Sequence, residues 1–225
     1  MGSMITLTAA DGHKFSAYEA KPAGRPRGGL VVVQEIFGVN PHVRWVADGY
    51  AADGYDVIAP AIFDRAERDV ELGYEGADRE KAMALRAAVP VAETLQDVAA
   101  AVALLKRAGK VGIVGYCWGG TVAWLSAAKV DGLSAAIGYY GGAIAGNLDV
   151  TPRCPVLLHF GEEDPAIPMT DVARIKAATD RKKVEIHAYK GAGHAFNRKG
   201  NTLWHEPSAN LARERTIAFL HQHVG

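Results

Sequence analysis

Cysteine is scarce in this chain, which has only Cys117 and Cys154 among its 225 residues. Two cysteines cannot build the disulfide framework that holds small secreted domains together. Neither has a further cysteine or a histidine at the spacing of a zinc site. The sequence therefore predicts no disulfide framework and no bound metal, and each cysteine has to be explained separately.

An excess of charge of one sign is also absent, because 25 Lys and Arg residues balance 25 Asp and Glu residues. No long basic block supplies the positive field that a phosphate backbone requires, so we expect no nucleic-acid partner. Apolar stretches such as residues 30–33 are far shorter than the roughly 20 residues of a bilayer span. The first residues lack the charged and then apolar pattern of a signal peptide. We expect a cytoplasmic protein without membrane contact.

The composition fits a single folded domain. The chain is 49% hydrophobic, enough to bury a substantial core. We expect residues 1–225 to form one domain, in which residues 1–3, ahead of a second methionine at Met4, were added before the natural start.

Apolar runs typical of strands alternate with helix-like stretches along most of the chain. The predicted strands are 30–34, 57–61, 111–115, 135–140, 156–160 and 184–189. The predicted helices lie near 42–52, 77–88, 93–108, 118–129, 170–179 and 207–223. Nearly continuous apolar strands between helices indicate an α/β protein with a mostly parallel sheet and helices on both faces.

Two segments depart from this alternation. Residues 5–9 and 14–20, joined through Asp11-Gly12, predict an antiparallel N-terminal hairpin. Residues 63–77 are the longest irregular piece and are rich in Asp, Glu, Arg and Gly. They are compatible with a mobile flap over a site and with a plain surface loop. No segment is long enough to form a large lid domain.

The most informative motif is Gly115-x-Cys117-x-Gly119, which follows an apolar strand-like run and opens a helix-like stretch. This is the pattern of a nucleophile elbow, in which small residues flank the nucleophile because the strand-to-helix turn is very tight. Such a turn exposes the nucleophile above the sheet. It also aims the N–H of Trp118 at the place where a substrate oxyanion would form.

An elbow predicts an acid and then a histidine later in the chain. Asp164 lies 47 residues after Cys117, just beyond a strand-like run, and His194 follows 30 residues later in a loop bracketed by glycines. His194 would accept a proton from Cys117, and Asp164 would orient the ring and stabilise the imidazolium. Asp164 is preferred because its short side chain precedes Pro165, which holds the backbone extended. The neighbouring acids at 162 and 163 remain alternatives.

Four segments resemble the dienelactone hydrolase family, the cysteine branch of the α/β-hydrolases. They read EIFG at 35–38, GYDVIAP at 54–60, GYCWGG at 115–120 and GHAFNR at 193–198. The resemblance runs from about residue 5 to the C-terminus without a large insertion. It implies the α/β-hydrolase fold, no cofactor, and hydrolysis of enol-lactones such as carboxymethylenebutenolide to a keto-diacid.

Carried over to this chain, the resemblance implies that Cys117, His194 and Asp164 form the catalytic triad. It implies that the N–H groups of Ile36 and Trp118 form the oxyanion hole. A free thiol is only a few per cent ionised near neutral pH, so the cysteine of such a triad has to be activated.

The resemblance also assigns three charged residues. Glu35 matches the glutamate that lies beside the resting cysteine and takes its proton when substrate arrives. Its alternative is a surface carboxylate at the end of a strand. Arg79 and Arg198 match two arginines that hold the substrate's carboxylate, which favours anionic lactones. For Arg79 the alternative is a solvated helical arginine beside Glu80.

The pocket matches the family less closely than the catalytic residues do. Phe37 and Tyr139 are assigned to substrate binding, although Tyr139, like Tyr140, is equally compatible with packing against helices. Met83 and Arg86 stand where family members that act on dienelactone carry bulky aromatic residues. The reaction class is therefore better defined than the substrate.

Two other functions remain open. One is a broad carboxylesterase or thioesterase with the same fold. The other is a non-catalytic protein that binds a small anion or uses Cys117 as a redox sensor. The expected partner in each case is a small molecule, an anionic lactone or ester for the enzymes, and the expected assembly is a monomer or a small homo-oligomer.

Overall fold

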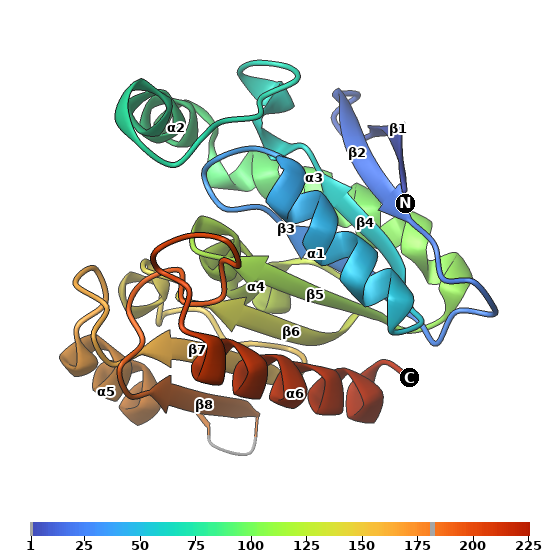
Figure 1. Cartoon of the computed structure of the whole chain (residues 1–225). Coiled ribbons are helices and arrows are strands. Elements are labelled where there is room, and N and C mark those ends of the chain that lie inside the picture. Colours follow the sequence, from blue (N-terminus) through green and yellow to red (C-terminus); the bar gives the residue numbers. More distant parts are fainter. Residues whose placement is uncertain (1, 181–182) are drawn as a thin grey trace.

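The computed structural model describes residues 2–180 and 183–225, and one eight-stranded sheet runs through them (Figure 1). The strand order is β1-β2-β4-β3-β5-β6-β7-β8. The strands are β1 (Ser3–Thr8), β2 (Lys14–Ala20), β3 (Gly29–Val33), β4 (Asp56–Pro60), β5 (Val111–Tyr116), β6 (Leu133–Tyr139), β7 (Val156–Gly161) and β8 (Val184–Tyr189).

Strands β3 to β8 are parallel, and β1 and β2 form an antiparallel hairpin that joins the sheet through β4. Every residue of β3, β4 and β5 is buried, which explains why their sequences, apart from Asp56 at the start of β4, are apolar without alternation. The hairpin begins at Ser3, two residues earlier than predicted. Ser3 pairs with Glu19 in the ladder, so a residue expected to precede the natural start extends the edge strand.

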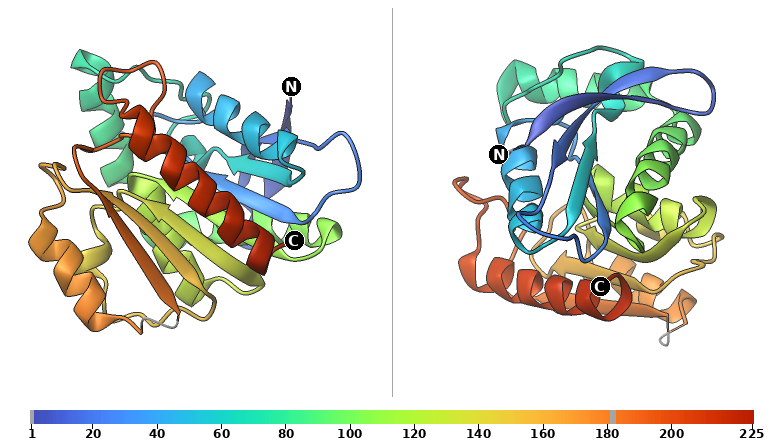
Figure 2. Two further views of the ribbon diagram at one scale, coloured as in Figure 1. Left: turned by 60° about the horizontal axis from the view of Figure 1, so that its bottom comes forward. Right: turned by 90° about the vertical axis from the view of Figure 1, so that its right-hand side faces the viewer.

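Helices cover both faces of the sheet, as predicted. They are α1 (Pro41–Ala52), α2 (Gly76–Ala88), α3 (Val91–Leu105), α4 (Trp118–Lys129), α5 (Met169–Ala178) and α6 (Glu206–His223). Figure 2 shows α1 and α6 on one face and α3 on the opposite face. The start of α1 is set by Asn40, whose side chain caps the N–H of Val43, and by Pro41 in the first turn. These elements form an α/β-hydrolase fold without a large lid.

Helix α2 stands apart from the other helices (Figure 1). It buries only Ala82 and Leu85, so most of its surface faces outward or toward the space above the sheet. Within the described residues no single helix is long and apolar enough to cross a membrane. Only the bent pair of Gly76–Ala88 and Val91–Ala108, taken together, reaches the required length and composition.

The segment 63–77 begins in a 3₁₀ helix, Ile62–Arg65, and ends in the first residues of α2, with a loop between them, and it is attached to the body at several points. Arg65 forms a buried ion pair with Asp97 of α3, with an Nη2 to Oδ1 distance of 2.8 Å. Further along, the N–H of Leu72 donates to the carbonyl of Phe37 over 3.0 Å. The loop therefore lies next to the end of β3, where the predicted site residues begin.

Candidate active site

Cys117 occupies the tight turn between β5 and α4. Its backbone has φ 55° and ψ −116°, a conformation that a non-glycine residue adopts only under constraint. A Cβ atom added to Gly115 would lie 1.8 Å from the carbonyl oxygen of Gly119. One added to Gly119 would lie 2.4 Å from the carbonyl oxygen of Val33. Both glycines are required because the chain passes itself so closely, as expected for a nucleophile elbow.

The structure brings Cys117, His194 and Asp164 into one line of contacts. The Sγ atom of Cys117 lies 3.2 Å from Nε2 of His194, and Nδ1 of His194 lies 2.7 Å from Oδ2 of Asp164. Asp164 is buried, and its other oxygen accepts the N–H of Ala166 over 2.8 Å. The alternative acid Glu163 is exposed, as is its neighbour at 162. Asp164 is thus the acid in contact with the histidine.

His194 carries a positive charge in this arrangement. Burial alone would lower the pKa of His194, but the hydrogen bonds and charges of Asp164 and Cys117 outweigh it and raise the pKa to about 10. The ring therefore holds a proton at neutral pH. It lies as a cation against the sulfur atom, which favours a negative charge on sulfur.

Two backbone N–H groups near the sulfur are free to bind an oxyanion. Ile36 follows β3 and Trp118 is the first residue of α4, and both line the cavity above Cys117. Within residues 2–180 and 183–225 neither N–H donates a hydrogen bond. The N–H of Trp118 is also at the positive end of the α4 dipole, which favours an anion there.

Glu35 pairs with Arg198 and not with the sulfur. Nε and Nη2 of Arg198 donate to the two carboxylate oxygens over 3.1 and 2.9 Å, and both side chains are buried. The guanidinium also stacks on Tyr74, with Cζ 4.0 Å from the ring centroid. The resemblance implies a glutamate beside the cysteine, whereas within the described residues the hydrogen-bond partner of Cys117 Sγ is His194. A bidentate buried ion pair accounts for this position of the carboxylate.

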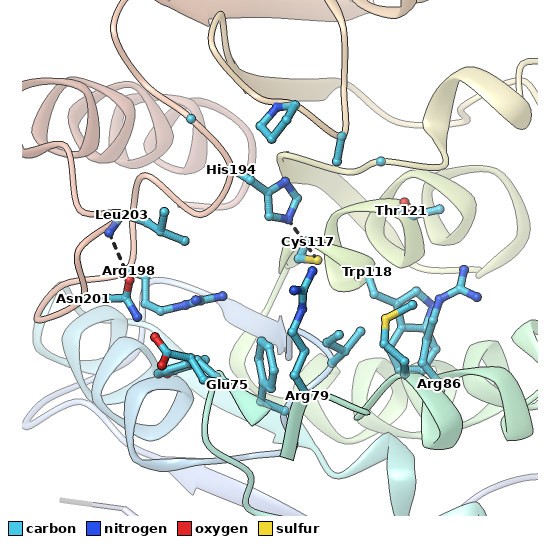
Figure 3. Close-up of a pocket in the computed structure, with 18 of the residues that line it drawn as sticks. Glu75, Arg79, Arg86, Cys117, Trp118, Thr121, His194, Arg198, Asn201 and Leu203 are labelled. Atoms are coloured by element: carbon cyan, nitrogen blue, oxygen red, sulfur yellow. Dashed lines mark hydrogen bonds between the residues drawn. The ribbon is translucent and has the colours of Figure 1, made fainter. Parts of the chain in front are cut away.

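These residues surround a cavity of about 810 Å³ (Figure 3). Of the residues predicted for the site, those that line it are Cys117, His194, Ile36, Trp118, Phe37, Arg79 and Arg198. Arg79 extends from α2 toward Cys117 across the cavity. Asp164 and Glu35 lie behind this lining, where they contact His194 and Arg198.

Tyr139 does not line the cavity, which corrects its assignment to substrate binding. Its side chain is fully buried, and its hydroxyl lies 3.1 Å from the carbonyl of Ala212 and 2.6 Å from Oγ1 of Thr216, both on α6. The sequence placed it at the carboxyl end of a strand but could not say which face of the sheet it would occupy. Tyr140, also fully buried, packs 5.1 Å from the His194 ring.

Sequence reasoning missed several residues of the lining. Tyr74 comes from the irregular loop, and an aromatic residue in a long polar loop was the available signal for it. Leu203 and its two preceding residues come from the segment after Arg198 and carry no motif. Over the described parts of the chain no three His, Cys, Asp or Glu side chains are grouped as a metal site would require.

Comparisons with known proteins identify the family of this chain. The model of the dienelactone hydrolase family matches residues 15–224. The chain is 33% identical over 224 residues to carboxymethylenebutenolidase of Pseudomonas putida, with 96% of this chain and 94% of that protein covered. The same identity and coverage hold for carboxymethylenebutenolidase of Pseudomonas knackmussii.

Solved structures give the same result. A candidate dienelactone hydrolase from Klebsiella pneumoniae superposes with a TM-score of 0.83 at 31% identity and covers 98% of this chain and 100% of its own. A dienelactone hydrolase-like promiscuous phosphotriesterase from metagenomic libraries shares the fold, with a TM-score of 0.79 at 18% identity over 100% of this chain and 99% of its own. The chain therefore belongs to the dienelactone hydrolase family and is a hydrolase of esters or lactones.

Proposed function

We propose that this protein opens an enol-lactone of the carboxymethylenebutenolide type, with Cys117 as the nucleophile of a Cys117-His194-Asp164 triad. The observation that carries the proposal is the contact from Sγ of Cys117 to Nε2 of a protonated His194, 3.2 Å long, at the floor of the cavity. Relatives that share a third of the sequence are carboxymethylenebutenolidases.

The first step is attack of the Cys117 sulfur on the lactone carbonyl carbon. A C–S bond forms, and the carbonyl π electrons move to the oxygen, which the N–H groups of Ile36 and Trp118 receive. Each such donor contributes about 3 kcal/mol in a hydrolase, so the pair is a large part of the catalytic effect. The imidazolium of His194 stays beside the sulfur and stabilises its negative charge until the C–S bond forms.

Collapse of this intermediate breaks the ring C–O bond. The electron pair leaves on the ring oxygen as an enolate, which takes the His194 proton and becomes an enol. The enol then tautomerises to the ketone of the product. Sulfur and acyl carbon remain joined as a thioester. The neutral His194 then removes a proton from water, water attacks the thioester, and Cys117 leaves with a carboxylate product formed.

The remaining charged residues favour an anionic substrate. Arg79 lines the cavity and has no ion pair within the described residues. Nε and Nη2 of Arg198 donate to Glu35, which leaves Nη1 to donate to a ligand. The Glu35 charge is itself neutralised by Arg198, so it does not oppose a negative sulfur.

Turnover of a carboxylated dienelactone compared with p-nitrophenyl acetate tests the proposal. We expect kcat/KM for the lactone to exceed that for the ester by at least about tenfold, because only the lactone carries an anion for Arg79 and Arg198. A broad ester hydrolase is the second candidate, favoured by a cavity of about 810 Å³ around so small a lactone. Faster turnover of the ester would support it and contradict our proposal, and turnover of neither would support a binding protein.

A further inference from the structure

Three side chains of α2 form one face of the helix above the cavity. Arg79, Met83 and Arg86 all line the cavity. Their spacing of four and seven residues places them in a row along the helix. Arg79 points toward Cys117, and Arg86 lies on the Trp118 side of the cavity (Figure 3). We call Arg79, Met83 and Arg86 the α2 face.

Both arginines of the α2 face have unused hydrogen-bond donors. Within residues 2–180 and 183–225 neither Arg79 nor Arg86 forms an ion pair or a side-chain hydrogen bond. Glu75 and Glu163 also line the cavity, yet neither lies within salt-bridge distance of these arginines. Solvation alone explains an exposed arginine such as Arg79. It explains Arg86 less well, because Arg86 is half-buried and still has no partner.

Arg198 differs from these two arginines. It is buried, and Glu35 already neutralises its charge through a bidentate contact. Arg198 still offers Nη1 as a hydrogen-bond donor to a ligand, but the arginines of the cavity lining that have no carboxylate partner among the described residues are those of α2. Arg79 and Arg86 are seven residues apart, so their Cα atoms are separated by about 10 Å along the axis of α2.

An apolar side chain lies between the two cations. Met83 is 53% exposed although it lines the cavity, and methionine is a flexible side chain that adapts to an apolar ligand. A ligand that fits the α2 face has a negative group at each end and hydrocarbon between them.

We propose that the α2 face is a second anion subsite and that the substrate carries two carboxylates. This proposal rests on the proposed function. Arg79 holds the carboxylate nearer the reacting carbonyl, Arg86 holds the one at the far end, and Met83 covers the carbon chain between them. Arg86 is thus a specificity-determining residue, which selects a dicarboxylated lactone or ester over a monocarboxylated one.

Binding of simple acids tests the subsite without any turnover. Calorimetry would compare glutarate, adipate and suberate with the monocarboxylates of the same chain lengths. We expect the best dicarboxylate to bind at least about tenfold more tightly than its monocarboxylate, because it gains charge-assisted hydrogen bonds to a second guanidinium. Arg86→Gln removes this advantage. The matched control is Lys81→Gln, on the same helix, where Lys81 pairs with Glu67 outside the cavity and its loss leaves the advantage intact.

The kinetic counterpart is the ratio of kcat/KM for a dicarboxylated and a monocarboxylated lactone, which Arg86→Gln lowers about tenfold. Equal binding of dicarboxylates and monocarboxylates by the wild type would overturn the subsite. So would an unchanged advantage in Arg86→Gln. Calorimetry tests the subsite without any turnover. A failure of the protein to hydrolyse lactones would therefore contradict the proposed function and leave the result for the subsite unaffected.

Discussion

The protonated ring of His194 is the charge that lies next to the Cys117 sulfur. Asp164 and Cys117 together raise the pKa of His194 to about 10 against the opposing effect of burial. Because the ring already holds a proton at neutral pH, it stabilises a negative sulfur and then supplies a proton to the leaving oxygen. An alcohol at position 117 would keep its own proton, since it is much harder to ionise than a thiol.

We therefore expect Cys117→Ser to lower kcat/KM by at least about 100-fold, the lower end of what a lost proton-transfer step costs. Cys117→Ala abolishes turnover. Both variants should unfold at the urea concentration of the wild type, because Cys117 is only partly buried and contributes little to the core. A serine variant that hydrolyses a lactone as fast as the wild type would mean that His194 works as an ordinary base for an alcohol.

The Glu35 and Arg198 pair is a second contact at the residue scale, and its contribution is to stability. Glu35→Gln leaves the buried guanidinium without its counter-charge, which costs about 3 kcal/mol when a buried pair is broken. Urea unfolding measures this loss. Replacing both partners with apolar residues, Glu35→Leu with Arg198→Met, should recover part of it. Equal stability of Glu35→Gln and wild type would show that solvent screens the pair.

At the scale of elements, the position of α4 against β3 determines the geometry of the oxyanion hole. The helix starts at Trp118, and its second residue, Gly119, approaches the end of β3 so closely that it has no room for a side chain. β3 in turn leads directly to Ile36. The two proposed oxyanion donors are therefore held in place by one helix-to-strand contact.

Gly119→Ala should separate the two donors. Its Cβ would meet the carbonyl oxygens of Val33 and Gln34 at 2.4 and 2.5 Å, so the backbone has to shift. We expect kcat to fall about 100-fold or more, as when one oxyanion donor is removed, with about 1–3 kcal/mol of overpacking cost. Gly49→Ala in α1 is the control, because a Cβ there meets nothing within 4 Å. Unchanged kcat in Gly119→Ala would argue against this oxyanion hole.

At the scale of the whole molecule, a buried polar network joins the second half of the sheet to α6. His159 of β7 is fully buried between the hydroxyls of Tyr189, 2.8 Å from Nδ1, and Thr216, 3.1 Å from Nε2. Tyr139 shares the Thr216 hydroxyl. Burial, with smaller effects of the positive charges of His187 and Arg215, lowers the pKa of His159 well below its ordinary value.

Stability should consequently fall as the pH drops below about 6.5, the ordinary pKa of histidine. Below that pH the unfolded chain binds a proton at His159 and the folded chain does not. The free energy of unfolding therefore falls by up to about 1.4 kcal/mol per pH unit. His194 acts above this pH range, because its raised pKa makes a contribution that is fully present below about pH 6.5 and is lost progressively as the pH rises to about 10. Urea unfolding at pH 7.5, 6.5 and 5.5 checks this. His159→Gln should have the shallower slope, and parallel slopes would contradict the assignment.

The order of strands and helices was predictable because each buried parallel strand is an apolar run and helix-like stretches separate these runs. The elbow and its downstream histidine were predictable because chain order reflects the order of strand ends. The pairing of Glu35 with Arg198 was not predictable, since the two residues are 163 positions apart. Nothing in the sequence near Glu35 shows whether its carboxylate pairs with Arg198 or lies beside the Cys117 sulfur. The face occupied by Tyr139 was not predictable either, because a one-residue difference in register reverses it.

The central claim, covalent catalysis by Cys117, is tested most directly by mass spectrometry of the wild type quenched during turnover of a dienelactone. A lactone keeps its leaving oxygen on the same carbon skeleton, so the thioester intermediate carries the full mass of the substrate. We expect this added mass on the peptide that contains Cys117. Cys154 stays unmodified, since burial raises its pKa to about 11. An adduct on any other residue, or turnover that survives in Cys117→Ala, would contradict the account.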